Sequence, residues 1–494
     1  MNPRNLFWLI FSISLVAKLL FAIYMPINTD EAYFVSWGKN LDYGYYDHPP
    51  MVGWLLWLML KFSDAIWWIR LPTIVVTSLI GWGIYRVLRD KGERSAVFAA
   101  SIYLLLPINL IAVLIATDTP LIFWIFLSVM AFYLAVRKDN INYFIMAGVC
   151  LGLAVLSKYF AALLGFAYLI YFLVYARNRT GMTRLFIIYV VTLPFIFINL
   201  YWNYNHCWTN YLFNFVNRHG SSDFSLNTVL TYWLMWVWLL PPLIYYTLKF
   251  HRRLSLQAVS PVFLIVFLVP LVLFAILSFV KEIGLHWILG FLPFVIILMG
   301  QLLSEQQLRT SLKFISVYGL LHIVVVVLVL SSPLSFIKPD NSLYKDIVLM
   351  FNASTAMDEL KRHAGGYHIT TQSYGPASVM SYYAGENVAV IGQGSHYARQ
   401  DDLNTDYRLW QGENVLIFSY MKNSLQKFES LFRQHHYKTI SVKGVEFYIL
   451  LGQSFDYQEY KQQHLKPALR YYQIPAVLPV GECYYYNKYF TDTP

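Results

Sequence analysis

The sequence is poor in charge. Only 13% of its 494 residues are Asp, Glu, Lys or Arg, and 57% are hydrophobic. A soluble domain usually carries about 25% charged residues. A chain of this length cannot hide so large an apolar surplus in one core, so lipid must cover part of it. The composition therefore argues against an ordinary soluble enzyme and predicts a membrane protein.

Cysteine is also scarce, and processing and nucleotide-binding signals are missing. The spacing of Cys150, Cys207 and Cys483 fits no zinc or redox motif, and a Cys207–Cys483 disulfide stays open because sequence separation does not give distance. No small-residue cleavage site follows the first apolar run, so residues 6–24 are predicted to be a retained membrane span. The 392–394 segment lacks the lysine and the full glycine pattern of a phosphate loop, which favours a turn.

Long apolar runs predict about eleven transmembrane helices, since a helix needs about 20 apolar residues to cross the hydrocarbon core. The predicted spans are 6–25, 66–86, 95–115, 119–136, 141–157, 160–176, 185–201, 227–247, 258–280, 286–303 and 312–331. The net charge is +10. Lys and Arg gather in alternate short connections, as the positive-inside rule requires, so the charge indicates topology and not a nucleic-acid partner. The N-terminus is expected to be cytoplasmic and the polar loops and tail extracytoplasmic.

The tail has a different composition, which predicts two domains: a transmembrane domain over 1–331 and a soluble α/β domain over 332–494. Helices are expected over 355–363, 425–435 and 457–471. Strands are expected over 388–391, 414–419 and 447–451.

The loop after the first span carries two acidic segments. Asp30-Glu31 lies near its start, and Asp47-His48-Pro49-Pro50 lies in its middle. Carboxylates at a membrane surface are costly unless they are paired or used. The pattern leaves two interpretations of Asp30 equally weighted, a cap on the helix through Trp37 and a catalytic group. For Asp47-His48 the plain alternative is a turn set by the prolines.

Other charged residues fall in the remaining outward loops, and each also has a structural interpretation. Asp118 could cap the helix that includes Pro120, Lys158 could be an interface lysine, and Lys281 could pair with Glu282. Arg218 and His286 complete the set. All of these residues are predicted to lie on the same side of the membrane. Carboxylates there could act as a general base, and cations there could bind a phosphate. We therefore expect a membrane enzyme that acts on a lipid-linked phosphate.

These motifs resemble those of GT-C glycosyltransferases, in particular the bacterial branch related to dolichyl-phosphate-mannose protein mannosyltransferases and lipid A aminoarabinose transferases. The resemblance covers about residues 1–330. The matching segments are Asp30-Glu31, Asp47-His48-Pro49-Pro50-Met51, Arg70-Leu71-Pro72, Thr117-Asp118-Thr119-Pro120-Leu121, Gly152-Leu153-Ala154, Ser157-Lys158-Tyr159, Tyr201-Trp202-Asn203, Arg218 and His286-Trp287.

The resemblance implies catalytic roles for the carboxylates Asp30, Glu31 and Asp118. It implies substrate contacts for Asp47, His48, Lys158, Tyr159, Arg218, Lys281 and His286, with the cations on the lipid phosphate. Asp47 stands where some relatives hold a metal ligand, while His48 stands where several relatives carry lysine. The resemblance makes no cofactor certain and leaves a divalent metal ion open.

The expected function is an inverting glycosyltransferase of the inner membrane. It would move a sugar from a polyprenyl-phosphate carrier, undecaprenyl phosphate, to lipid A, lipopolysaccharide or another envelope glycan, with membrane lipids as its other partners. A protein O-glycosyltransferase of the same family is the alternative. A flippase for a lipid-linked saccharide is a further alternative, although such transporters usually show repeated halves and charge at mid-membrane, which this sequence lacks.

Overall fold

The computed structural model describes residues 2–217, 224–250, 256–331, 342–393 and 400–490. The chain forms two compact units. The first, here called the helical unit, comprises Met1–Met25, Ser63–Phe197 and Ser221–Ser332. The second, here called the sheet unit, comprises Pro26–Phe62, Ile198–Gly220 and Pro333–Pro494. The first outward loop therefore belongs to the same unit as the tail, which sequence order alone does not indicate.

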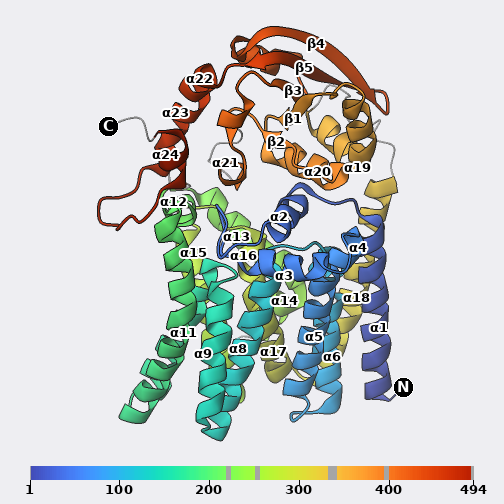
Figure 1. The fold of residues 1–494 in the computed structure, drawn as a ribbon. Coiled ribbons are helices and arrows are strands. Elements are labelled where there is room, and N and C mark those ends of the chain that lie inside the picture. The colour runs from blue at the N-terminus through green and yellow to red at the C-terminus, as the bar shows by residue number, and fades with distance from the viewer. Residues whose placement is uncertain (1, 218–223, 251–255, 332–341, 394–399, 491–494) are drawn as a thin grey trace. The chain divides into compact units, whose positions relative to one another are not determined.

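The helical unit consists of helices joined by short connections (Figure 1). They are α1 (Pro3–Tyr24), α4 (Ile66–Ile69), α5 (Leu71–Leu88), α6 (Glu93–Leu105), α7 (Pro107–Ile111), α8 (Asp118–Lys138), α9 (Ile141–Val155), η1 (Tyr159–Ala161), α10 (Ala162–Tyr175), α11 (Arg179–Asn205, which runs on into the sheet unit), α13 (Leu226–Leu239), α14 (Pro241–Phe250), η4 (Leu256–Ala258), α15 (Pro261–Leu277), α16 (Leu285–Ile288), η5 (Leu289–Phe291), α17 (Leu292–Leu302) and α18 (Glu305–Ser331).

Helices occupy every one of the predicted spans, but not all are long. Among the described residues, six helices are long and apolar enough to cross a membrane. Proline explains two of the breaks. Pro107 ends the run predicted over 95–115 after α6, and Pro241 divides the run predicted over 227–247 into α13 and α14. Proline lacks the N–H that a continuous helix requires, so it stands at the first position of each new helix.

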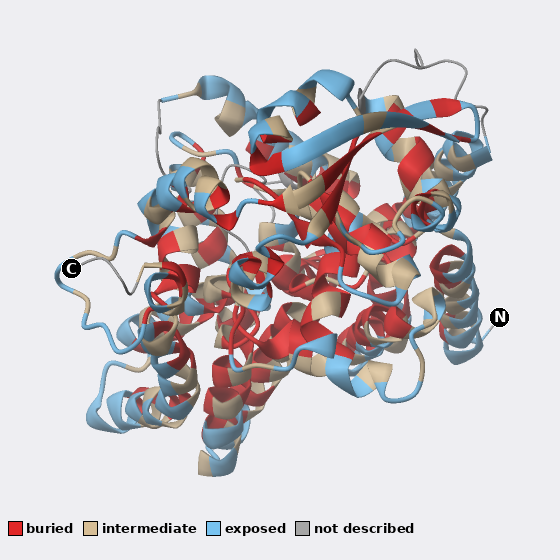
Figure 2. Cartoon of the chain, turned by 45° about the horizontal axis from the view of Figure 1, so that its top comes forward, coloured by how far each residue is buried: buried red, intermediate tan, exposed pale blue. Residues whose placement is uncertain are grey.

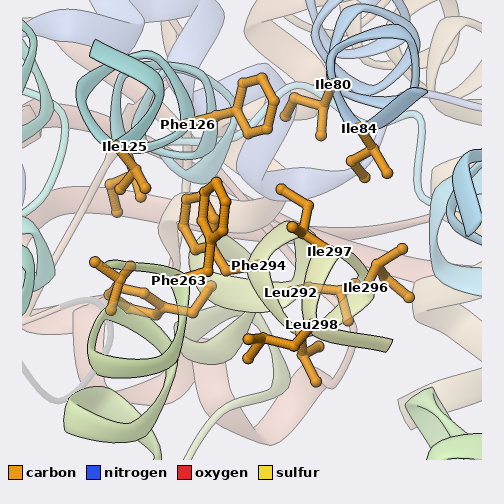
Figure 3. Close-up of a cluster of buried hydrophobic side chains, with 14 of the residues drawn as sticks. Ile80, Ile84, Ile125, Phe126, Phe263, Leu292, Phe294, Ile296, Ile297 and Leu298 are labelled. Atoms are coloured by element: carbon orange, nitrogen blue, oxygen red, sulfur yellow. The ribbon is translucent and has the colours of Figure 1, made fainter. Parts of the chain in front are cut away.

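Aromatic and branched aliphatic side chains form the core of the helical unit (Figure 3). The Phe294 ring stacks on Phe126 from α8 and on Phe263 from α15, with centroid distances of 6.2 and 6.3 Å. The buried Arg70 donates from Nη1 to the carbonyl oxygens of Ala22 and Met25 at 3.1 and 2.8 Å. A cation at a helix C-terminus stabilises its unpaired carbonyls, so this motif arginine fixes the end of α1.

The sheet unit combines one mixed sheet with short helices. Its elements are α2 (Thr29–Lys39), α3 (Met51–Leu60), α12 (Thr209–Phe215), α19 (Ser342–Lys361), β1 (Tyr367–Thr371), α20 (Tyr374–Ala384), β2 (Ala389–Val390), α21 (Gln400–Asn404), η7 (Tyr407–Trp410), β3 (Asn414–Ser419), η8 (Lys422–Leu431), β4 (Phe432–Val442), β5 (Val445–Phe455), α22 (Tyr457–Tyr460), η9 (Lys461–Leu465), α23 (Lys466–Ala468), η10 (Leu469–Tyr472) and α24 (Tyr484–Tyr489).

The strand order is β2-β1-β3-β5-β4, with parallel pairs at β1 and antiparallel pairs at β5. β3 is almost wholly buried, whereas the outer strand β4 is mostly exposed (Figure 2). Polar side chains on β4 suit an edge strand, because charge there discourages pairing with another chain.

Most of the tail predictions are confirmed, and one is wrong. The strand over 414–419 is confirmed as β3, and the helix over 457–471 is confirmed as a chain of short helical turns. The helix predicted over 425–435 is wrong beyond Leu431, where β4 begins. Lys443 and Gly444 have φ values of 51° and 79° and form a two-residue hairpin turn to β5. Such turns match the twist of paired strands, so long-range pairing overrides the local helical preference.

Cys207 and Cys483 form a disulfide in the sheet unit. The bond joins the segment before α12 to the segment before α24, and both cysteines belong to the buried core around Tyr472 and Tyr485. The Cys207–Cys483 pairing that the sequence left open is therefore decided by the fold. Cys150 is buried and free.

Candidate active site

Asp30 and Glu31 lie in the first turn of α2, but Asn28 caps this helix. The Asn28 side chain accepts a hydrogen bond from Glu31 N at 2.7 Å, and Glu31 Oε2 accepts one from Asn28 N at 3.2 Å. This reciprocal capping box satisfies two backbone N–H groups. The interpretation of Asp30 as the cap is therefore wrong, because Asn28 takes that place. Glu31 is buried and orients the start of the helix that carries Asp30.

Asp30 is exposed and accepts a hydrogen bond at Oδ1 from the Tyr374 hydroxyl at 3.1 Å. The protein packed around it displaces enough water to raise the pKa of the Asp30 carboxyl, and the nearby charges of Asp47 and Glu31 raise it further. The Tyr374 hydrogen bond and His48 act in the opposite direction. A carboxylate with a raised pKa is a stronger base than an ordinary aspartate.

Asp47 and His48 lie beside Asp30 as a pair. Asp47 Oδ2 is 3.3 Å from His48 Nδ1, and Asp47 Oδ1 accepts from the Tyr33 hydroxyl at 3.4 Å. The proline turn expected here is also present, since Tyr45 N donates to the His48 carbonyl oxygen at 3.0 Å before α3 begins. The segment therefore forms a turn and also presents two titratable side chains to the Asp30 neighbourhood.

Side chains from distant segments hold this turn in place. Asn214 of α12 donates to the Asp47 carbonyl oxygen at 2.8 Å, and Asn210 donates to the Tyr45 carbonyl oxygen at 2.9 Å. Gln400 N donates to the Tyr33 hydroxyl oxygen at 3.3 Å. Sequence reasoning missed these residues.

The sequence could have indicated Tyr33 as a site residue, because it follows Asp30 by three positions and so lies on the same helix face. Tyr374 and Gln400 had none, because they lie more than three hundred residues away from their partners.

In the helical unit, Lys158 and Asp118 form a buried ion pair. Lys158 Nζ lies 3.0 Å from each carboxylate oxygen of Asp118, and the side chains are only 10% and 12% exposed. Lys158 stands in extended backbone between α9 and η1, which turns its side chain toward the first turn of α8. Lys158 does not expose its ammonium as a snorkelling lysine would, because the ammonium is buried against the Asp118 carboxylate.

Lys158 and Lys281 share an aromatic platform. Lys158 Nζ lies 5.7 Å from the centroid of Phe160, and Lys281 Nζ lies 5.8 Å from that of Trp287. The Phe160 and Trp287 rings are 4.5 Å apart. Aromatic faces attract cations without neutralising them, so two predicted phosphate ligands lie in one neighbourhood.

The exposed His286 flanks this platform, with its ring 6.3 Å from that of Trp287. Tyr159 is half-buried next to Lys158. Arg218 lies outside the described residues.

The structure thus groups the predicted residues into two sets. The sheet unit holds Asp30, Glu31, Asp47 and His48, and the helical unit holds Asp118, Lys158, Tyr159, Lys281 and His286. Within the described ranges, no group of three or more His, Cys, Asp or Glu residues could hold a metal ion. Asp47 instead contacts Tyr33 and His48.

Parts of the chain are similar to known proteins. Residues 47–202 match the family model described as dolichyl-phosphate-mannose-protein mannosyltransferase. A lipid A galacturonosyltransferase, RgtD of Rhizobium johnstonii, is 29% identical over 181 residues, which are 36% of this chain and 38% of that protein. The match therefore spans less than half of the curated relative.

Solved structures extend the likeness to most of the chain. ArnT from Cupriavidus metallidurans in the apo state has a TM-score of 0.63 at 14% identity, covering 91% of this chain and 98% of its own. The same protein bound to undecaprenyl phosphate has a TM-score of 0.60, with 90% and 97% covered. The fold is therefore that of the ArnT structures, mostly helical with a sheet region toward the C-terminus.

Proposed function

We propose that this protein is an inverting glycosyltransferase that moves a sugar from undecaprenyl phosphate to lipid A, lipopolysaccharide or another envelope glycan. The proposal rests on the hydrogen bonding and the pKa of the Asp30 carboxylate. One carboxylate oxygen accepts from Tyr374, no described residue donates to the other, and the pKa is raised. A base in this state can take the proton from an acceptor hydroxyl as the new glycosidic bond forms.

The donor's leaving group is a phosphate, which departs more easily when cations neutralise its growing charge. We assign this role to Lys158, Lys281 and His286 of the helical unit, and to Arg218. Asp118 keeps the Lys158 ammonium in place, at 3.0 Å, before the donor binds. Tyr159 and His48 are assigned to substrate contact, and Glu31 supports the base by fixing the start of α2.

Two comparisons support the choice of donor and acceptor. The ArnT structure was solved with undecaprenyl phosphate, and RgtD is named as a lipid A galacturonosyltransferase. The description of the matching family also names protein mannosyltransfer, so a protein hydroxyl is the second acceptor class.

The proposed topology places the N-terminus in the cytoplasm, and the first loop and the domain over 332–494 outside it. The Cys207–Cys483 disulfide supports this arrangement, because disulfides form and persist in oxidising compartments. Its two cysteines lie in the predicted fourth outward loop and in the tail. The domain over 1–331 would then be embedded in the inner membrane.

The test is transfer of a radiolabelled sugar from polyprenyl phosphate to lipid A in membranes that contain Asp30→Asn. The variant should lose at least about a hundredfold of the rate, the usual contribution of a general base. Asp358→Asn, at an exposed position of α19, is the matched control and should transfer normally. Full activity of Asp30→Asn would refute the base. Transfer to protein in place of lipid would select the second acceptor class, and lipid translocation without transfer would favour a flippase.

A further inference from the structure

A pocket of about 470 Å³ lies wholly within the sheet unit, apart from the groups assigned to catalysis above. Its lining residues directly follow α2 and α11 or belong to α21 and α24. The lining residues are Asn40, Leu41, Asp42, His206, Gln400, Leu403, Asn404, Tyr484 and Lys488. Small-molecule sites commonly have volumes of about 300–1,000 Å³. The volume is therefore sufficient for a small organic ligand.

The pocket contains a lysine, but that lysine is already used. Lys488 Nζ donates to the carbonyl oxygens of Asp402, Leu403 and Thr405 at 3.3, 3.1 and 3.1 Å. An ammonium has three protons, and all three hold the end of α21. The pocket therefore offers no free ammonium to a phosphate, which argues against an anionic ligand.

Asp42 and His206 face each other in the wall. His206 Nδ1 donates to the Trp202 carbonyl oxygen at 2.8 Å, since that oxygen can only accept, and Nε2 is the ring nitrogen nearer to Asp42. This Nε2 lies 4.0 Å from Asp42 Oδ2. Asp42 Oδ1 is occupied by Tyr43 N at 2.6 Å. The Oδ2 atom of Asp42 favours a ligand that brings donors, such as the hydroxyl groups of a sugar.

The other residues of the pocket wall also combine fixed polar groups with apolar surface. Gln400 accepts from Tyr46 N at 2.8 Å and donates to Asn404 Oδ1 at 3.3 Å, which fixes both amides. Tyr484 contributes a ring face, oriented by its hydroxyl contact to Tyr472 at 3.3 Å. Leu41 adds an exposed apolar surface. Fixed amides, a carboxylate oxygen of Asp42 and an apolar edge match the alternating hydroxyl and C–H surfaces of a pyranose ring.

The pocket shares structural elements with the Asp47 segment. Gln400 in the pocket wall donates through its backbone N to the Tyr33 hydroxyl oxygen, and that hydroxyl donates to Asp47 Oδ1. We propose that this pocket binds a neutral pyranose ring of the saccharide substrates. The inference rests on the proposed function and adds a second, non-catalytic contact to it.

The test uses the full-length protein in detergent micelles and saturation-transfer NMR with the methyl glycosides of glucose, galactose and N-acetylglucosamine. Two variants change the pocket differently. Asp42→Asn removes the charge but keeps an oxygen for Tyr43 N, and Leu41→Trp fills the pocket without removing a hydrogen bond. Asp42→Asn should weaken binding of the glycoside about tenfold, near the lower end of the value of a hydrogen bond to a charged group. Leu41→Trp should weaken it at least as much, because the indole ring takes the space of the sugar. Asp358→Asn should bind normally.

Binding should persist in Asp30→Asn, and inorganic phosphate should not compete. Failure of all three glycosides to bind, wild-type affinity in both pocket variants, or displacement by phosphate would overturn the inference. Kinetics of Leu41→Trp distinguish the source of the ring: a raised KM for the acceptor indicates the acceptor glycan, and a raised KM for the lipid-linked donor indicates the donor sugar. If neither KM changes, the inference also fails. Glycoside binding without any transferase activity would refute only the proposed function.

Discussion

Lys158 Nζ lies 3.0 Å from both carboxylate oxygens of Asp118, and the two side chains are almost completely buried. The pair makes one prediction about stability. Lys158→Met leaves an uncompensated buried carboxylate, so it should cost about 3–5 kcal/mol of unfolding free energy. Unfolding of the purified protein in detergent, followed by far-UV circular dichroism, measures the cost.

Two further variants make that prediction specific. The double variant Asp118→Asn/Lys158→Met removes both charges and should recover much of the loss. Glu305→Gln breaks the exposed Arg94–Glu305 pair at 3.3 Å and should cost no more than about 1 kcal/mol. Equal losses in the exposed and buried pairs would contradict the role assigned to burial.

The capping box at α2 predicts different effects for two substitutions of Glu31. Glu31→Gln keeps an oxygen for Asn28 N, so the box survives. Glu31→Ala loses it and should destabilise the sheet unit by about 1 kcal/mol. If Glu31 acts by orienting Asp30, Glu31→Gln should keep most of the transfer rate while Glu31→Ala lowers kcat. A Glu31→Gln variant as inactive as Asp30→Asn would instead place Glu31 in the chemistry.

The Tyr374–Asp30 hydrogen bond predicts a shift in the pH profile. This bond lowers the pKa of Asp30, so Tyr374→Phe should raise that pKa further. A base is active only when deprotonated, and the acidic limb of kcat/KM should therefore move to higher pH. Tyr486→Phe, at an exposed position of α24, should leave the profile unchanged. A shift toward lower pH in Tyr374→Phe would contradict the assignment.

The raised pKa of Asp30 also predicts a stability effect. A carboxyl whose folded-state pKa lies above its unfolded value binds protons more tightly when folded. Its contribution to stability is therefore complete below the ordinary value of about 3.9 and is lost as pH rises through the folded pKa. Asparagine does not ionise, so Asp30→Asn does not lose this stability as pH rises. The variant should therefore have a slightly higher Tm than the wild type at pH 7. The difference should disappear under acidic conditions.

The Cys207–Cys483 disulfide predicts how many thiols react with a probe and how much the crosslink contributes to the free energy of unfolding. The denatured, unreduced protein should react with one maleimide, at Cys150, and with three after reduction. Cys207→Ala/Cys483→Ala should lose about 2–4 kcal/mol, because a crosslink between distant residues restricts the unfolded chain. Cys150→Ser should show no free thiol before reduction. Three reactive thiols without a reductant would refute the crosslink.

The sequence predicted the helical unit well because a membrane helix is a local property. A long apolar run satisfies its own backbone hydrogen bonds wherever it lies, so helices appear in all predicted spans, interrupted where Pro107 and Pro241 lack an N–H. β4 was missed because its stability comes from pairing with β5 and not from its own residues. The same reason explains the loss of the predicted helix beyond Leu431.

The sequence by itself indicated a membrane protein and its helical runs, and it singled out Asp30, Glu31, Asp118 and Lys158 as candidates, because charge in an apolar chain stands out without any structure. Only the tertiary structure decided what those charges do. It gave the cap of α2 to Asn28, paired Lys158 with Asp118, brought Tyr374 to Asp30 across 344 residues, and joined Cys207 to Cys483. The Asn28 cap is a contact between residues three positions apart, but the other three contacts join residues 40, 344 and 276 positions apart and depend on the folded path of the chain.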